Sequence, residues 1–135
     1  MKAFQDFTVM VVGAGTMGLS MAQVMAANGI KTYMTSRHES TLKSAQEKIN
    51  VAIDGLIKEG MADEQYREQV ARHLFPITND KFSEVGQEVD VVFETVVENP
   101  DSKRAIYQQL NDWCRADCIM ASNTSGMDIF TVTSE

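Results

Sequence analysis

The sequence predicts an α/β fold, in which helices cover both faces of a doubly wound and mostly parallel sheet. Short apolar runs typical of buried strands alternate with segments of helical periodicity along the 135 residues. A glycine-rich segment, Gly13–Gly18, stands at the junction of the first strand and the first helix. Because 44% of the residues are hydrophobic, the chain can bury one core, and we expect residues 1–135 to form one domain.

The first half of the chain opens with two strands and two helices. Thr8–Val12 is almost entirely apolar, which predicts a strand buried on both faces. Thr16–Asn28 is rich in small and apolar residues and precedes a glycine, as a helix does. Lys31–Thr35 contains residues that favour strands. Ser36 and Glu39 have the spacing of a capping box, so we expect Ser36 to open the second helix.

The second helix begins a helical excursion between strands two and three. Apolar residues recur at steps of three and four over Leu42–Leu56, and the helix should end near Gly60. A further helix is expected from about Asp63 to Arg72. Leu74–Thr78 then predicts a third strand, and Pro76 within it suits either the edge of a sheet or the start of a strand, because proline cannot donate to a strand ladder.

Two more strands and one helix complete the predicted fold. Val89–Val97 is the most apolar run of the chain, and Pro100 suits the first turn of the helix that follows. That helix carries Ile106, Leu110 and Trp113. Cys118–Ala121 predicts the last strand.

The glycine-rich segment reads Gly13-Ala14-Gly15-Thr16-Met17-Gly18, which is G-x-G-x-x-G between a strand and a helix. This context is the fingerprint of a Rossmann-type dinucleotide-binding fold. Gly13 permits the tight turn, Gly15 lets a pyrophosphate approach the backbone, and Gly18 lets the helix pack closely on the strand. Thr16 and Met17 open the helix whose N-terminus would face the pyrophosphate. A glycine-rich turn without a ligand is the alternative.

The end of the second strand bears on the choice of cofactor. An acid is expected there to bind the adenosine ribose of NAD, but Ser36 holds the place. Serine carries no charge to repel a 2′-phosphate, and Arg37 beside it offers a planar set of donors to that phosphate. NADP is therefore favoured over NAD. In the alternative, Ser36 only caps the second helix and Arg37 lies in solvent.

Polar residues follow the last two strands. Glu94–Asn99 and Ser122–Ser125 lie at the carboxyl ends of these strands, where doubly wound sheets bind ligands. The two segments, Asn123 included, are candidates for the nicotinamide and substrate end of a site. Each residue could also serve only as a helix cap or in a turn.

Together with Met21–Val24, these motifs resemble the 3-hydroxyacyl-CoA dehydrogenases over essentially the whole chain. The resemblance implies that Glu98 and Lys103 lie against the cofactor and that Ser125 bonds the 3-oxygen of an acyl-CoA substrate. Such enzymes transfer a hydride between the nicotinamide and C3 of the acyl-CoA, with a histidine as general base. That histidine is expected beyond Ser125, and neither His38 nor His73 matches it.

The resemblance further implies a helical C-terminal domain, absent from this chain, which supplies the homodimer contacts and much of the acyl-CoA cleft. The fragment is therefore expected to be inactive alone. Two departures from the family pattern bear on specificity. Ser36 puts NAD in doubt, and Gly126 and Met127 put the acyl-chain preference in doubt.

Two other functions fit parts of the sequence. One is a β-hydroxyacid dehydrogenase of the 3-hydroxyisobutyrate type, which shares the glycine pattern and an arginine after strand two. The helical excursion and the Ser-Asn-Thr-Ser segment argue against it. The other is a nucleotide-binding or structural module without catalysis.

Composition narrows the partners and the compartment. The net charge is −7, and Lys and Arg are scattered, so we expect no nucleic-acid partner. No signal peptide or membrane span is visible, and Cys114 and Cys118 lack the second pair that a zinc site requires. The two cysteines are expected to be reduced structural thiols, which favours a cytoplasmic protein without metal or membrane contacts.

Overall fold

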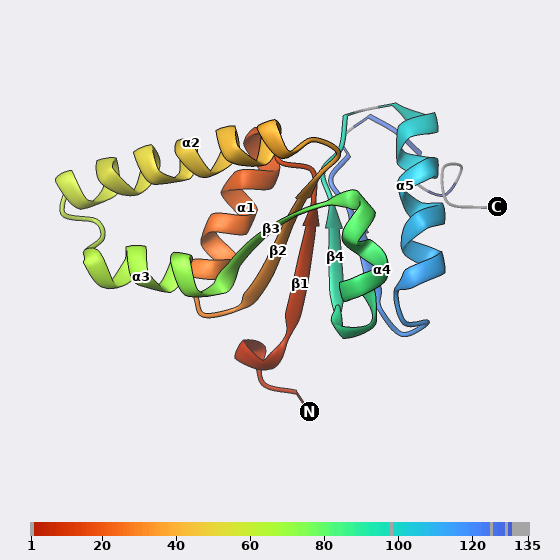
Figure 1. The fold of residues 1–135 in the computed structure, drawn as a ribbon, viewed down its shortest axis with the longest axis horizontal. Helices are drawn as coiled ribbons and strands as arrows, with labels where there is room; N and C mark the ends of the chain where they lie inside the picture. Colours follow the sequence, from red (N-terminus) through yellow and green to blue (C-terminus); the bar gives the residue numbers. More distant parts are fainter. Residues whose placement is uncertain (1, 98, 125, 129, 131–135) are drawn as a thin grey trace.

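The computed structural model describes residues 2–97, 99–124, 126–128 and 130. Its centre is a five-stranded sheet with the strand order β3-β2-β1-β4-β5, in which every neighbouring pair is parallel (Figure 1). The strands are β1 (Thr8–Val12), β2 (Lys31–Ser36), β3 (Leu74–Thr78), β4 (Val91–Glu94) and β5 (Ile119–Ser122). This order confirms the doubly wound Rossmann-type sheet and places β3, with its Pro76, at an edge as predicted.

Helices cover both faces of the sheet. One face carries α1 (Thr16–Ala27), α2 (Glu39–Lys58) and α3 (Glu64–His73), and the other carries α4 (Phe82–Val85) and α5 (Pro100–Trp113) (Figure 1). Short 3₁₀ turns lie at Phe4–Asp6, Asn79–Lys81 and Gly86–Glu88. The predicted excursion between the second and third strands is the α2–α3 hairpin, which extends well beyond the sheet.

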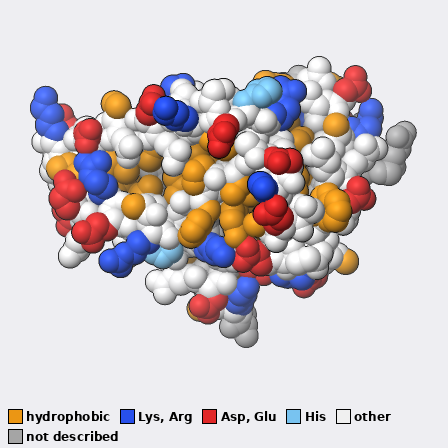
Figure 2. Space-filling view, in the orientation of Figure 1, with side chains coloured by type: hydrophobic (Ala, Val, Ile, Leu, Met, Phe, Trp, Pro, Cys, Tyr) orange, Lys and Arg blue, Asp and Glu red, His pale blue; other side chains and the backbone are white. Residues whose placement is uncertain are grey.

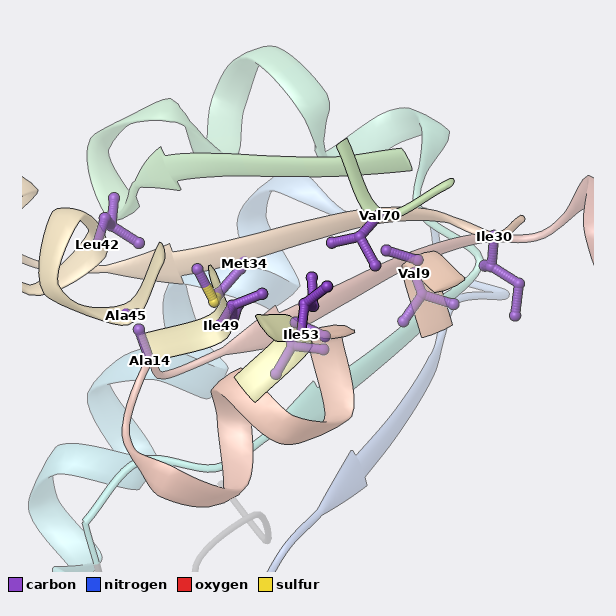
Figure 3. Close-up of a cluster of buried hydrophobic side chains, with 12 residues drawn as sticks. Val9, Ala14, Ile30, Met34, Leu42, Ala45, Ile49, Ile53 and Val70 are labelled. Carbon is purple, nitrogen blue, oxygen red and sulfur yellow. The ribbon is translucent and has the colours of Figure 1, made fainter. Parts of the chain in front are cut away.

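The two faces of β1 contribute side chains to two separate hydrophobic clusters. Val9 and Val11 pack with residues of α1, α2 and α3, whereas Met10 and Val12 pack with residues of α4 and α5. Figure 3 shows the first cluster, in which Ile49 and Ile53 of α2 point toward Met34 of β2. Because both faces are covered, the successive side chains from Val9 to Val12 are all buried, which explains why these four residues are all apolar.

Local signals set the helix ends as the sequence predicted. Gly29 and Gly60, which follow α1 and α2, have φ of +80° and +71°, the left-handed conformation that glycine adopts without strain. The Asp63 carboxylate accepts a hydrogen bond from the Tyr66 amide at 3.1 Å and caps α3. Asn99 caps α5 in the same way, through the Ser102 amide at 3.0 Å, and Pro100 occupies the first turn.

Two predictions about elements were wrong, and the short elements between β3 and β4 were not predicted. Ser36 does not open α2: it is the last residue of β2, and the N-cap is His38. The strand predicted over Val89–Val97 is limited to Val91–Glu94, because its pairing with β1 ends where Val12 meets Glu94. The segment between β3 and β4 holds α4 and two 3₁₀ turns that lack a readable period.

Figure 2 shows the face that carries β3 and the α2–α3 hairpin. Hydrophobic side chains gather along its middle, between the two helices, whereas Lys and Arg side chains alternate with Asp and Glu around them. Within the described part of the chain, no helix is long and apolar enough to cross a membrane.

Candidate functional site

A cleft of about 580 Å³ opens at the carboxyl edge of the sheet. Its walls come from the segments that follow β1, β2, β3 and β4 and from the first turns of α5. The lining residues are Gly13, Ala14, Gly15, Ser36, Arg37, Asn79, Thr95, Val96, Val97, Asp101, Ser102, Ala105, Ile106 and Gln109. The cleft lies where the chain order of the strands reverses, between β1 and β4, which is where doubly wound sheets bind their ligands.

The three glycines of the loop between β1 and α1 differ in what a side chain would meet there. Gly13 has φ of +108°, and its amide donates to the Thr35 carbonyl at 2.9 Å, which fixes the turn. A Cβ on Gly18 would lie 2.0 Å from the Gly13 carbonyl oxygen, so only glycine allows this packing. A Cβ on Gly15 would meet no protein atom within 4 Å. Gly15 therefore borders open space on the cleft wall.

The N-terminus of α1 opens beside Gly15. Gly15 is the N-cap residue, and no side chain caps the helix. Thr16 and Met17 in the first turn are exposed. Uncapped amides at the positive end of a helix bind anions, so this end can hold a phosphate.

The hydroxyl of Thr95, the first residue after β4, contacts the backbone of the glycine loop. Its hydroxyl donates to the Val12 carbonyl at 3.0 Å and lies 3.3 Å from the Gly13 carbonyl oxygen. A Cβ on Gly13 or on Gly18 would lie 2.7 Å from Thr95 Oγ1. Thr95 thus occupies the space that these two glycines leave. Sequence reasoning did not single it out, because nothing local shows that its hydroxyl turns toward β1.

Ser36 and Arg37 lie together on the cleft wall at the end of β2. The Ser36 hydroxyl is 3.4 Å from the His38 amide, and Arg37 is exposed. Among the described residues, Arg37 has no ion-pair partner. Ser36 and Arg37, the predicted pair, therefore face the cleft. The Arg37 guanidinium is available to bind an anion, and no carboxylate stands at the end of β2.

Asn79 closes this part of the cleft from the end of β3. Its side-chain oxygen is buried and has no hydrogen-bond partner among the described residues. The residue was not among those predicted from the sequence. An Asx residue after a strand usually indicates only a turn.

Beneath the cleft, Lys103 and Glu94 form an ion pair that is completely buried. Lys103 Nζ donates to the two carboxylate oxygens at 2.9 and 2.7 Å and to the Val96 carbonyl at 3.2 Å. The Ser122 hydroxyl and the Val96 amide also donate to Glu94, at 2.6 and 2.8 Å. This cluster ties β4, α5 and β5 together. Lys103 lies under the wall formed by Val96 and does not line the cleft itself.

The other predicted site residues lie at the ends of β4 and β5. Asn123 is exposed. Its backbone amide donates to the Glu94 backbone carbonyl at 2.7 Å, which holds the end of β5 beside β4. Glu98 and Ser125 lie outside the described residues. His38 is exposed before α2, whereas His73 precedes β3 and so lies at the opposite edge of the sheet from the cleft. The described ranges hold no cluster of metal-ligating side chains.

The two cysteines are free thiols near the opposite end of α5. Burial raises the pKa of Cys114, and burial together with the neighbouring Cys114 raises the pKa of Cys118 to about 12. A thiol with a raised pKa is a poor nucleophile at neutral pH. Neither thiol is therefore expected to react as a nucleophile at neutral pH, and the structural role of both cysteines stays a prediction.

Comparisons with known proteins agree with this geometry. The family model described as "3-hydroxyacyl-CoA dehydrogenase, NAD binding domain" matches residues 8–135. A 3-hydroxyadipyl-CoA dehydrogenase of Escherichia coli is 27% identical over 128 residues, which are 95% of this chain and 26% of that protein. A 3-hydroxybutyryl-CoA dehydrogenase of Clostridioides difficile is 26% identical over 124 residues, with 92% and 43% covered.

Solved structures give the same result. The (S)-3-hydroxybutyryl-CoA dehydrogenase of Ralstonia eutropha superposes with a TM-score of 0.87 at 28% identity, covering 94% of this chain and 44% of that one. The 3-hydroxybutyryl-CoA dehydrogenase of Escherichia coli K12 gives 0.88 at 26% identity, with 96% and 27% covered. This chain thus spans between about a quarter and less than half of these relatives. Since the family match runs over residues 8–135, the chain belongs to the NAD-binding domain family of the 3-hydroxyacyl-CoA dehydrogenases.

Proposed function

We propose that this chain is the cofactor-binding domain of a 3-hydroxyacyl-CoA dehydrogenase and that it holds NADP(H) in preference to NAD(H). The observation that carries the first part is the open surface at Gly15, next to an uncapped helix N-terminus and within a cleft of about 580 Å³. The pyrophosphate would lie on this surface, against the amides of Gly15, Thr16 and Met17. When bound, the nicotinamide donates or accepts the hydride.

The preference for NADP(H) rests on charge at the end of β2. Enzymes specific for NAD place a carboxylate there, which binds the ribose hydroxyls and repels a 2′-phosphate. Here Ser36 and the exposed Arg37 face the cleft instead. Among the described residues that line the cleft, the only acid is Asp101, which pairs with Arg104 at 3.4 Å. The Arg37 guanidinium, which has no ion-pair partner in the described part of the chain, supports binding of a phosphate.

The reaction and its remaining participants follow from the family. We propose that Ser125 bonds the 3-oxygen of an acyl-CoA and that Glu98 and Asn123 contact the nicotinamide end of the cofactor. Lys103 would act on that end indirectly, since it holds the Val96 carbonyl and the cleft wall in place. The general-base histidine, the remainder of the acyl-CoA cleft and the homodimer contacts would come from a helical domain that follows this one. The free thiols Cys114 and Cys118 support a cytosolic location.

Calorimetric titration of the chain with NADPH and with NADH tests the proposal. We expect both to bind and NADPH to bind more tightly, with a difference that shrinks at high salt because a phosphate–guanidinium contact is screened. Tighter binding of NADH would retain the dehydrogenase domain and refute the role of Arg37. Failure of both nucleotides to bind a correctly folded chain would refute the cofactor-binding function and favour a structural module.

A further inference from the structure

We infer that Asn79 recognises the adenosine ribose of the bound dinucleotide and that its side-chain oxygen accepts a hydrogen bond from the ribose 3′-hydroxyl. The inference rests on the proposed function and assigns a residue outside the glycine motif and outside β2. Its starting point is the buried oxygen of Asn79, which has no partner among the described residues. A buried acceptor without a partner is costly, and a bound molecule that donates a hydrogen bond to it would remove that cost.

The position of Asn79 identifies the class of donor that reaches it. Asn79 lines the same cleft as Ser36 and Arg37, and it follows β3, which pairs with β2 up to the contact of Ser36 with Thr78. Asn79 is therefore the first residue after β3, next to the position where a Rossmann fold places its ribose-binding acid. A ribose is the part of a dinucleotide that lies there, and hydroxyl groups are the donors that it offers.

Because the end of β2 carries no acid, a second residue is needed to bind the ribose hydroxyls. A carboxylate at the end of β2 would accept hydrogen bonds from the 2′- and 3′-hydroxyls together. With Ser36 in that place, a 2′-phosphate can be held by Ser36 and Arg37, but the 3′-hydroxyl still needs an acceptor. Asn79 supplies that acceptor without a negative charge beside the phosphate. The 3′-hydroxyl occurs in both NAD(H) and NADP(H), so Asn79 contributes affinity for either nucleotide.

The test is a binding cycle that combines the Asn79→Ala substitution with NAD⁺ that lacks the adenosine 3′-hydroxyl. We expect Asn79→Ala to weaken binding of NADPH and NAD⁺ by about three- to tenfold, the effect of one hydrogen bond. The same substitution should leave the affinity for the 3′-deoxy nucleotide unchanged. Asn50→Ala is the matched control, since Asn50 is exposed on α2, away from the cleft, and it should change neither affinity.

A second substitution separates ribose recognition from general damage to the cleft. Asn79→Asp keeps the shape and the acceptor but brings a negative charge next to the 2′-position, so it should lower the affinity for NADPH about tenfold and that for NAD⁺ much less. If Asn79→Ala weakens the 3′-deoxy nucleotide as much as NAD⁺, Asn79 does not bind the 3′-hydroxyl. If Asn79→Ala lowers only the unfolding midpoint, its oxygen holds a structural water instead. Failure of the native chain to bind any dinucleotide would refute the proposed function itself.

Discussion

At the scale of single residues, the glycines of the phosphate loop differ in what an added methyl group would meet. We expect Gly18→Ala to abolish cofactor binding and to destabilise the fold, because its Cβ would collide with the Gly13 carbonyl. Gly15→Ala has room in the free protein and should change the free energy of unfolding by less than about 1 kcal/mol. It should still weaken cofactor binding at least about tenfold, because the methyl group occupies the approach of the pyrophosphate.

Urea unfolding and calorimetric titration measure these two effects separately. Gly55→Ala is the control: Gly55 lies inside α2 with open space around it, so alanine there should stabilise the helix by about 0.5–1 kcal/mol and leave binding intact. Unchanged affinity in Gly15→Ala would show that no ligand approaches this loop.

Arg37 is the residue on which the cofactor preference depends. Replacing it with alanine should weaken NADPH binding by about 1.5–3 kcal/mol, the strength of a hydrogen bond to a charged group, and should hardly affect NADH. Titration with both nucleotides at two salt concentrations gives the change in preference. Arg72→Ala is the matched control, because this exposed arginine lies in the last turn of α3 and does not line the cleft. An equal loss for both nucleotides would place Arg37 elsewhere than at the 2′-phosphate.

At the scale of elements, the Glu94–Lys103 pair connects the strands and the helix that form one side of the cleft. Lys103→Met should lower the free energy of unfolding by about 3–5 kcal/mol, because it leaves the fully buried Glu94 without its cation. Lys81→Met, which breaks the exposed pair with Glu84, should cost less than about 1 kcal/mol. Urea unfolding of the two variants provides the comparison. Similar losses of unfolding free energy in the two variants would mean that the hydrogen bonds from the Ser122 hydroxyl and the Val96 amide are enough to stabilise the buried Glu94 carboxylate.

The start of the chain is attached to β1 and β4 through Asp90, and this attachment depends on pH. Burial raises the pKa of Asp90, but hydrogen bonds from Lys2, the Thr8 amide and Arg115 outweigh it and lower the pKa to about 2. Because the pKa is lower in the folded state, the stabilisation of about 2 kcal/mol is complete above the unfolded pKa of about 4 and is lost as the pH falls toward 2.

Urea unfolding between pH 7 and pH 2 reveals this contribution when the native chain is compared with Asp90→Asn. The difference between the two should be largest at pH 7 and should shrink steadily below pH 4. A difference that stays constant down to pH 2 would mean that Asp90 does not titrate with a lowered pKa in the folded protein.

At the scale of the whole molecule, periodicity and the glycine motif were enough to predict the doubly wound parallel sheet and the long helices. The buried strand Thr8–Val12 and the apolar stripe of α2 are strong local signals, and each was correctly placed. Asn79 and Thr95 acquire their roles only when β3 and β4 are packed beside β1 and β2, so no local pattern marks them. Ser36 matched a capping box by spacing alone, but sheet pairing with Thr78 carried the strand through it.

The 135-residue chain has no histidine among the described residues that line its cleft. We expect this chain to bind NADPH. We expect it to catalyse the oxidation of NADPH by acetoacetyl-CoA about 10²- to 10⁴-fold more slowly than a family member that has its general base. Neither of its two histidines lines the cleft: His38 is exposed before α2, and His73 is at the opposite edge of the sheet. Absorbance at the NADPH band measures the rate, with the 3-hydroxybutyryl-CoA dehydrogenase of Clostridioides difficile as the positive control. Steady turnover that disappears in His38→Ala would overturn this expectation, because it would make His38 the proton donor.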